Sequence, residues 1–189
     1  DSVQTAVAGG VGFNGSNTDK VFGIRFEAPD FASARGDPCR AVWGKGEMAN
    51  LTALATWVSA ESRGMRFNLP YSHEKEKVFY EVGKRLFFQR GGPHDFSCAS
   101  CHGQDDKRIR LQDLPNLMTE KGAQAAYTTW PAYRVSQGEV RTMQHRLYDC
   151  LRQQRFPEPT YGSDVITALT MYLAKNANGG TYDGPNMKR

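Results

Sequence analysis

Two cysteines and a histidine in the stretch FSCASCHGQ, residues 96–104, are the residues of this chain whose types and spacing are best suited to chemistry. In the pentapeptide CASCH, the thiols of Cys98 and Cys101 can add to the vinyl groups of a haem, while the imidazole of His102 reaches the iron from one face. Zinc half-sites and redox dithiols use the same residue types. No second C-x-x-C pair occurs in the 189 residues, which weakens the zinc alternative. The motif therefore predicts one covalently attached haem c.

The iron of such a haem has a second face, and the sequence offers two candidate ligands for it. Met143 is the most credible of the methionines that follow His102, because an electron-carrying cytochrome usually uses methionine there. Cys150 lies seven residues further on, and its thiolate would lower the reduction potential, which does not suit a carrier at high potential. A third interpretation is that Cys150 is a free cysteine packed as a small hydrophobic side chain. These considerations leave three alternatives open: Met143 as the second iron ligand, Cys150 as that ligand, or Cys150 as a packed free thiol.

The surroundings of Cys150 are rich in arginine. Five arginines and no lysine lie between Tyr133 and Glu158 (Arg134, Arg141, Arg146, Arg152 and Arg155). In a helix, Arg146 would lie one turn before Cys150 on the same face, so that a guanidinium and a sulfur can meet the same ligand. Cations near a thiol also stabilise its thiolate. The pattern predicts an anion site beside a reactive sulfur, with a solvated basic face as the plain alternative.

Two predicted helices would position these residues. The first follows Ser72, which can cap it, and Gly83 lies within its apolar face (Val78, Phe79, Val82 and Leu86). The second follows Ser163 and also has an apolar stripe (Val165, Ile166, Leu169, Tyr172 and Leu173). A glycine at a helix crossing permits close approach of the two backbones. The pair is typical of a small class I cytochrome c, so the expected fold is mostly α-helical.

A weak internal repeat links the two ends of the chain. The segment LTALATWVSAESRG, residues 51–64, is similar to ITALTMYLAKNANG, residues 166–179, and each follows a cysteine outside the C-x-x-C-H motif, Cys39 or Cys150. The alternative is a chance likeness between two amphipathic helices of common composition. The repeat predicts two related halves, of which only the second contains the haem motif.

The predicted halves are residues 1–69, a degenerate cytochrome c-like half without haem, and residues 70–189, the haem-binding cytochrome c domain. The boundary is placed before Pro70, because proline breaks a helix and favours an extended residue ahead of it. An extended linker is therefore expected to lead into the haem domain.

Composition and charge exclude other classes of protein. A net charge of +4 is far from the dense basic stripe of a nucleic-acid binder. No run of about 20 apolar residues occurs, so membrane insertion is not expected, and the start at Asp1 lacks the pattern of a signal peptide. Because c-type haem attachment implies export, the expected location is a bacterial periplasm, with the signal already removed.

Three longer stretches extend these motifs: PCRAVWGKGEMANLTALATWVSAESRGM, KRLFFQRGGPHDFSCASCHGQ and HRLYDCLRQQRFPEPTYGSDVITALTMYLA. Over residues 38–179 the chain resembles the SoxA family, the larger cytochrome subunits of the SoxAX complexes of periplasmic sulfur oxidation. Dihaem members have a further C-x-x-C-H in the first half, with a cysteine ligand at the place of Cys39. This chain keeps Cys39 and lacks that motif, so it resembles the monohaem form. Cys39 is then either a vestigial buried thiol or the partner of a cysteine in another protein.

The resemblance implies roles for the site residues. An arginine precedes a cysteine by four residues in the family, and Arg146 and Cys150 have this spacing. By resemblance, Cys98 and Cys101 attach the haem. His102 and Cys150 are then the two iron ligands, and Cys150 carries an additional sulfur atom as a persulfide.

The resemblance also implies an activity, that of an L-cysteine S-thiosulfotransferase. Thiosulfate is oxidatively joined to a cysteine of a SoxYZ carrier protein at Cys150 and Arg146, and electrons leave through the haem to that of a SoxX subunit in a heterodimer. Two alternatives stay open: a thiosulfate dehydrogenase that forms tetrathionate, and a simple electron-transfer cytochrome with His102 and Met143 as ligands. Product analysis distinguishes the first, and the identity of the ligand distinguishes the second.

Overall fold

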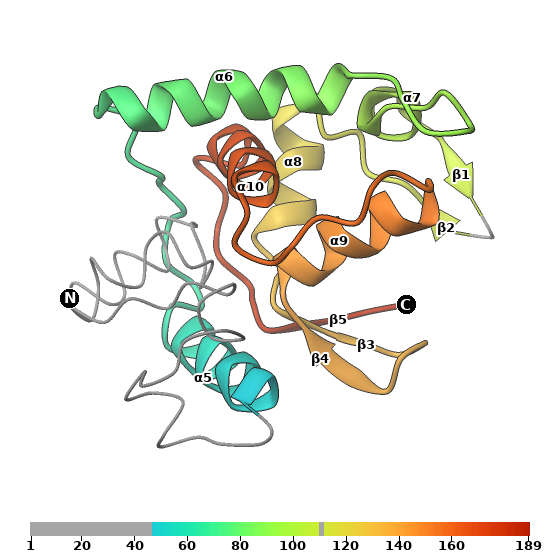
Figure 1. Ribbon diagram of the computed structural model, residues 1–189. Helices are drawn as coiled ribbons and strands as arrows, with labels where there is room; N and C mark the ends of the chain where they lie inside the picture. The colour runs from blue at the N-terminus through green and yellow to red at the C-terminus, as the bar shows by residue number, and fades with distance from the viewer. Residues whose placement is uncertain (1–46, 110–111) are drawn as a thin grey trace, which may run out of the picture.

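The structure is a computed structural model that describes residues 47–109 and 112–189. Within these ranges the chain forms six helices: α5 (Glu47–Glu61), α6 (Glu74–Phe88), α7 (Cys98–His102), α8 (Glu120–Tyr127), α9 (Met143–Gln153) and α10 (Asp164–Asn176). It also forms five short strands: β1 (Arg108–Ile109), β2 (Gln112–Asp113), β3 (Ala132–Arg134), β4 (Glu139–Arg141) and β5 (Asn186–Lys188). Helices dominate the described chain, which confirms the predicted mostly α fold (Figure 1).

The two predicted helices, α6 and α10, cross at close range (Figure 1). A Cβ atom added to Gly83 would lie 2.0 Å from the backbone oxygen of Ala168, so only glycine permits this approach. Beyond the crossing, the rings of Phe87 and Tyr172 meet with centroids 5.1 Å apart. Residues 166–174 of α10 are buried throughout, so this helix is the centre of the core.

One of the two predicted N-cap residues, that of α10, is the observed one. His73, and not Ser72, is the N-cap of α6: its Nδ1 accepts a hydrogen bond from the backbone N–H of Lys75 at 3.1 Å. The Glu76 carboxylate completes a capping box by accepting from the backbone N–H of His73 at 3.0 Å. Ser163 is the N-cap of α10, as predicted, although its side chain makes no capping hydrogen bond.

One residue of the predicted apolar face of α6 is misplaced. The side chain of Val78 is largely exposed to solvent. The buried positions of α6 are Gly83 and Phe87. The face of α6 that meets the core runs at helical spacing through Phe79, Gly83 and Phe87, and Val78 lies beside it.

Helix α5 and the segment after it share a core with the C-terminal part of the chain. Phe67 is fully buried, and its backbone N–H donates to the Gly180 oxygen at 2.7 Å. The hydroxyl groups of Ser59 and Tyr182 are also hydrogen-bonded. The segment that leads into α6 is thus extended, as expected, and packed rather than solvated.

The two segments of the predicted repeat end alike. Gly64, after α5, has φ +85°, and Gly179, after α10, has φ +87°. Glycine adopts this left-handed conformation at helix ends without steric cost. Cys39 and most of residues 1–69 lie outside the described residues, so the haem-less half and its boundary at Pro70 stay predictions.

A three-stranded sheet of order β4-β3-β5 lies below α9 in Figure 1. Strand β4 pairs antiparallel with β3, and β5 pairs parallel with it. The chain passes from β4 directly into α9 through Thr142, whose hydroxyl accepts from the backbone N–H of His145 at 3.3 Å. No sequence pattern predicted this sheet.

None of the described helices is long and apolar enough to cross a membrane.

Candidate functional site

The C-x-x-C-H motif forms the short helix α7. Ser97 begins it through a capping box with Ser100: each hydroxyl accepts from the other residue's backbone N–H, at 3.1 and 3.0 Å. Cys98 and Cys101 are free thiols and half-buried. Burial, followed by the proximity of Cys150, raises the pKa of Cys98 to about 12.

His102 is held in the tautomer that a metal ligand needs. Its Nδ1–H donates to the backbone oxygen of Pro115 at 2.9 Å, which leaves the lone pair of Nε2 free. Burial, and to a lesser degree the nearby Arg146 cation, lowers the pKa of His102 below its usual value, while the Pro115 hydrogen bond opposes the shift. The imidazole is therefore neutral and fixed in orientation, ready to donate Nε2 to a metal.

Helix α9 brings Cys150 to the cysteines of α7. Burial raises the pKa of the Cys150 thiol, and the charge of Arg146 opposes this shift. Cys101 lies close enough to add to the shift of Cys150, and Cys150 in turn acts on Cys98. Cys98, Cys101 and Cys150, the thiol cluster, are thus near enough for their charges to interact although they are distant in sequence.

The loop before α7 packs on the end of α9 and fixes this arrangement. A Cβ atom on Gly91 would lie 2.9 Å from the ring of Phe156, and one on Gly92 would lie 2.9 Å from the Gln154 oxygen. Gly92 also has φ +67°, a conformation that favours glycine. The segment that carries the haem motif and the segment that carries Cys150 are thus in direct contact.

Arg146 is positioned by the carboxylate of Asp149. Its Nη1 lies 3.6 Å from Asp149 Oδ2, while Arg152 and Gln153 donate hydrogen bonds to the same carboxylate at 2.8 and 2.7 Å. Burial alone would raise the pKa of Asp149, but these hydrogen bonds and the two arginines hold it below its usual value. Asp149 is therefore ionised beside Cys150.

The methionines have other surroundings. Met143 is partly buried against the core at the first turn of α9, two turns before Cys150. Met171 belongs to the core, whereas Met118 and Met187 are largely exposed. The Met118 sulfur would lie 3.3 Å from a Cβ atom on Gly103, directly after His102, and Cys150 is near enough to Cys98 and Cys101 for their charges to interact.

The donor set fits a covalently attached haem. Two half-buried thiols lie on α7, the Nε2 lone pair of His102 is free, and a third thiol comes from α9. Within residues 47–109 and 112–189, no three His, Cys, Asp or Glu side chains come together as a metal site.

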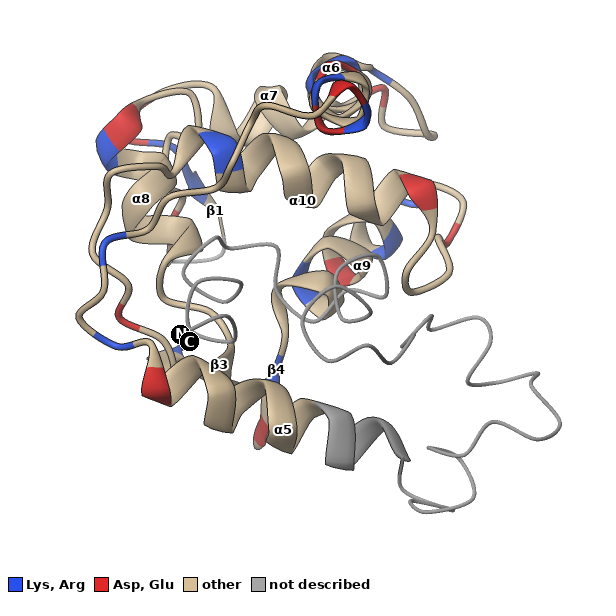
Figure 2. Ribbon diagram, turned by 90° about the vertical axis from the view of Figure 1, so that its left-hand side faces the viewer, with Lys and Arg blue, Asp and Glu red and all other residues tan. Residues whose placement is uncertain are grey.

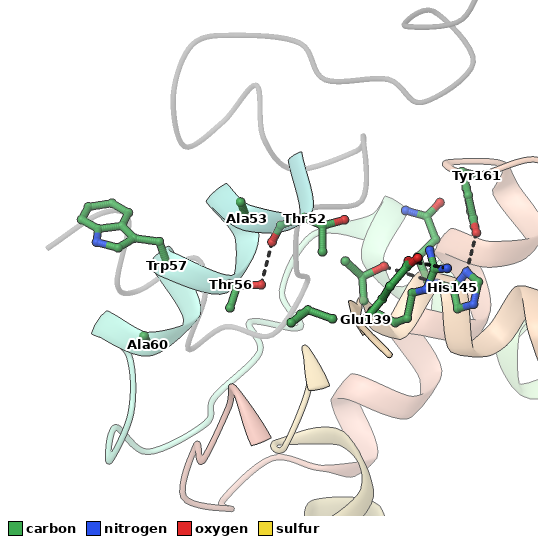
Figure 3. Close-up of a pocket in the computed structure, with 12 residues that line it drawn as sticks. Thr52, Ala53, Thr56, Trp57, Ala60, Glu139, His145 and Tyr161 are labelled. Carbon is green, nitrogen blue, oxygen red and sulfur yellow. Dashed lines mark hydrogen bonds and ion pairs between the residues drawn. The ribbon is translucent and has the colours of Figure 1, made fainter. Parts of the chain in front are cut away.

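A separate pocket of about 850 Å³ lies between α5 and the junction of β4 with α9 (Figure 3). Thr56 and Trp57 line it from α5, and Glu139, His145 and Tyr161 line it from the other side. His145 is hydrogen-bonded through Nδ1 to the Tyr161 hydroxyl at 2.8 Å. Neither the motif residues nor Cys150 line this pocket, so it is distinct from the thiol cluster.

Sequence reasoning missed two neighbours of Cys150. Asp149 is detectable in principle, because Arg146, Asp149 and Arg152 follow each other at the three-residue spacing of helical ion pairs. Arg134 was noticed only as one of several arginines, yet its charge acts on Cys150 from strand β3. The position of Arg134 depends on a strand that no pattern predicted.

A helix pair closed by a glycine crossing, with a C-x-x-C-H helix whose histidine donates to a proline oxygen, defines the chain as a c-type cytochrome. The chain belongs to the family described as SoxA/TsdA, cytochrome c domain, whose sequence pattern matches residues 82–181. This class of domain carries haem c, and the predicted membership is confirmed.

Named relatives agree with the family. A protein of Hydrogenophilus thermoluteolus named L-cysteine S-thiosulfotransferase subunit SoxA is 52% identical over 147 residues, 78% of this chain and 54% of that protein. A protein of the same name from Hydrogenobacter thermophilus is 39% identical over 141 residues, 74% of this chain and 53% of that protein. The chain spans about half the length of the curated relatives it matches.

A solved structure shares the fold. One chain in the crystal structure of SoxXA from P. pantotrophus matches with a TM-score of 0.68 and 24% identity, covering 100% of this chain and 68% of that chain. This likeness concerns the fold, and it agrees with the assignment of the chain to the c-type cytochromes.

Proposed function

We propose that this chain is the cytochrome subunit of an L-cysteine S-thiosulfotransferase that joins thiosulfate to a cysteine of a carrier protein. The observation that supports this most is the meeting of Arg146 and Cys150 with the thiols of the haem motif, since a simple electron carrier has no need of a cation beside a buried sulfur. The names of the relatives, L-cysteine S-thiosulfotransferase subunit SoxA, point to the same activity.

The proposed site assigns a role to each residue. Cys98 and Cys101 attach one haem c, and His102 binds its iron through Nε2. Cys150 would be a second ligand of the iron, and its persulfide sulfur would take up the sulfane sulfur of thiosulfate. Arg146 holds the sulfonate end, because a planar guanidinium can donate to two oxygens at once.

The reaction is an oxidation that forms one sulfur–sulfur bond. The sulfane sulfur of thiosulfate bonds to the outer sulfur of the Cys150 persulfide with the loss of two electrons. The carrier cysteine, having lost its thiol proton, then attacks the sulfane sulfur and releases the Cys150 persulfide anion, which is ready for the next cycle. The haem supplies the one-electron steps by which the pair of electrons passes to an oxidised partner cytochrome.

The residues around Cys150 favour these two steps. Arg146 partly neutralises the thiosulfate dianion and favours the anionic persulfide of Cys150 as leaving group. The ionised Asp149 keeps Arg146 from turning away, since their ion pair spans one helical turn. The partial burial of Cys150 limits the access of water to its sulfur bond.

The proposal extends to partners and location. A SoxX subunit would accept the electrons in a heterodimer, and a SoxYZ carrier would supply the acceptor cysteine. The protein would act in the periplasm, because covalent haem attachment takes place on exported proteins. A persulfide on Cys150 and a haem-less first half with an unligated Cys39 complete the proposed monohaem form.

Product analysis tests the proposal. The haem-loaded chain with its partner cytochrome would be given thiosulfate, an oxidised acceptor cytochrome and a carrier with one cysteine. Mass spectrometry of the carrier should show an S-thiosulfonate group on that cysteine in proportion to the acceptor reduced. Tetrathionate with unmodified carrier would instead identify a thiosulfate dehydrogenase, and acceptor reduction with neither product would leave an electron-transfer cytochrome.

A further inference from the structure

Two cations lie in register on one face of the β4-β3-β5 sheet. The Cα atoms of Arg134 and Lys188 are partners in the parallel pairing of β3 with β5, so their side chains leave the sheet on the same side. Both residues are partly buried, whereas Tyr133 and Met187, on the opposite face, are exposed. Like charges directly opposite each other destabilise a sheet. Their retention at a half-buried position therefore calls for an anion.

The nearby carboxylates already have partners. Asp149 accepts from Arg152 and Gln153, Glu139 pairs with Arg141 at 2.6 Å, and Asp183 pairs with Arg63 at 3.5 Å. In the part of the chain that the structure describes, the side chains of Arg134 and Lys188 form no ion pair within 4.0 Å. Asp149 and Asp183 act on Arg134 and Lys188 at longer range, so the described residues balance the positive charge of this face only in part.

The sheet lies beside α9, the helix that carries Cys150. Strand β4 continues into α9, and the turn between β3 and β4 touches α9 where the Gln137 amide lies 3.4 Å from His145 Nε2. Arg134 lies close enough to α9 to interact with the charges of Arg146 and Cys150. Figure 2, with Lys and Arg in blue, shows basic positions on α9 and on the strands beside it. Arg134 therefore approaches Cys150 from the sheet, while Arg146 approaches it along the helix.

We propose that Arg134 is a second sulfonate-binding residue of the thiosulfate site, supported by the neighbouring charge of Lys188. This inference rests on the proposed function and adds to it. A sulfonate has three oxygens, and one guanidinium can hold two of them, so a second arginine from another element can hold the third. Part of the charge of Arg146 is offset by Asp149, so a dianion is better neutralised by two arginines. Lys188 adds positive charge from the adjacent strand without contacting the ligand.

The test is a calorimetric titration of thiosulfate into the haem-loaded chain with its partner cytochrome, at low ionic strength. Arg134→Gln should weaken thiosulfate binding about tenfold, because it removes a hydrogen bond between charged groups. Arg134→Lys keeps the charge without the planar fork and should weaken binding about threefold. The matched control is Arg108→Gln, which removes the same charge from an exposed position on β1 and should leave binding within about twofold.

The absorption spectrum of each variant shows whether haem attachment and ligation are intact. If Arg134→Gln fails to fold, the Arg134→Lys variant provides the test. Weaker thiosulfate binding with an unchanged spectrum supports the inference, and unchanged thiosulfate binding overturns it. Binding by Arg134→Gln equal to that of Arg108→Gln would overturn it as well, as would a wild-type protein that binds no thiosulfate. Weakened binding without any carrier product would retain the sulfonate site and reject only the transfer activity.

Discussion

The glycine crossing between α6 and α10 makes a quantitative prediction. In Gly83→Ala, the new Cβ would lie 2.0 Å from the Ala168 oxygen and 2.9 Å from the Tyr172 Cβ. Ordinary contact begins near 3.4 Å, so the two backbones must separate by roughly 1 Å to reduce the overlap. Because both obstacles belong to a buried helix, no flexible side chain can move aside.

The expected change in the free energy of unfolding has three contributions. Overpacking against backbone costs about 3 kcal/mol. Separation also loosens the contact between the rings of Phe87 and Tyr172, which is worth about 1 kcal/mol. Alanine regains about 1 kcal/mol over glycine through its higher helix propensity. The free energy of unfolding should therefore fall by about 3 kcal/mol, which lowers Tm by roughly 6–12 °C for a domain of this size.

Thermal unfolding of the haem-loaded protein, followed by far-UV circular dichroism, measures the effect. Gly138→Ala is the matched control, because Gly138 has φ +68° and no atom within 4 Å of an added Cβ. It should cost only about 1 kcal/mol of left-handed strain. A fall in Tm for Gly83→Ala no larger than that for Gly138→Ala would refute the close crossing.

Three further substitutions address the site. Cys150→Ala should abolish turnover while the haem stays attached through Cys98 and Cys101; full activity with an unchanged ferric spectrum, measured by absorption, would exclude Cys150 as a ligand and reactant. Arg146→Ala should reduce kcat/KM for thiosulfate about 100-fold with the ligation spectrum intact, and a change of spectrum without a kinetic effect would contradict its role. The pKa of Asp149 lies below its unfolded value, so its stabilisation is present above about pH 4 and is lost as the pH falls through its folded pKa. Asp149→Asn should therefore remove part of the loss of stability on acidification, as seen in urea unfolding at pH 7 and pH 3, and an unchanged pH dependence would exclude this ion pair as its source.

The sequence predicted the parts of the fold that depend on local patterns. The C-x-x-C-H motif and the stripes of α6 and α10 repeat at spacings that one chain segment contains, and Gly83 marks their crossing. Ser72 was a reasonable cap, but His73 prevailed because Glu76, three residues further, completes a capping box with it. Val78 was misplaced because the stripe that packs on the core runs at four-residue spacing through Phe79, Gly83 and Phe87, and Val78 is one position off it.

The rest depended on contacts between distant segments. Arg134 faces Cys150 only because β3 and β4 form a hairpin that leads into α9, and strands of three residues have too little alternation to be recognised. The packing of Gly91 on Phe156 likewise joins segments that no spacing connects. Arg146 and Cys150 were recognisable because a single helical turn separates them.

The central claim is that a covalent haem and a sulfur-carrying Cys150 form one site, and the mass of the untreated protein tests it most directly. Intact-mass measurement followed by peptide mapping should find one haem bound through Cys98 and Cys101, and one additional sulfur atom on the peptide that contains Cys150. One haem with an unmodified Cys150 would contradict the sulfur-carrying role and favour electron transfer. A protein purified from a host that matures c-type cytochromes, yet without any covalent haem, would contradict the account at its first motif.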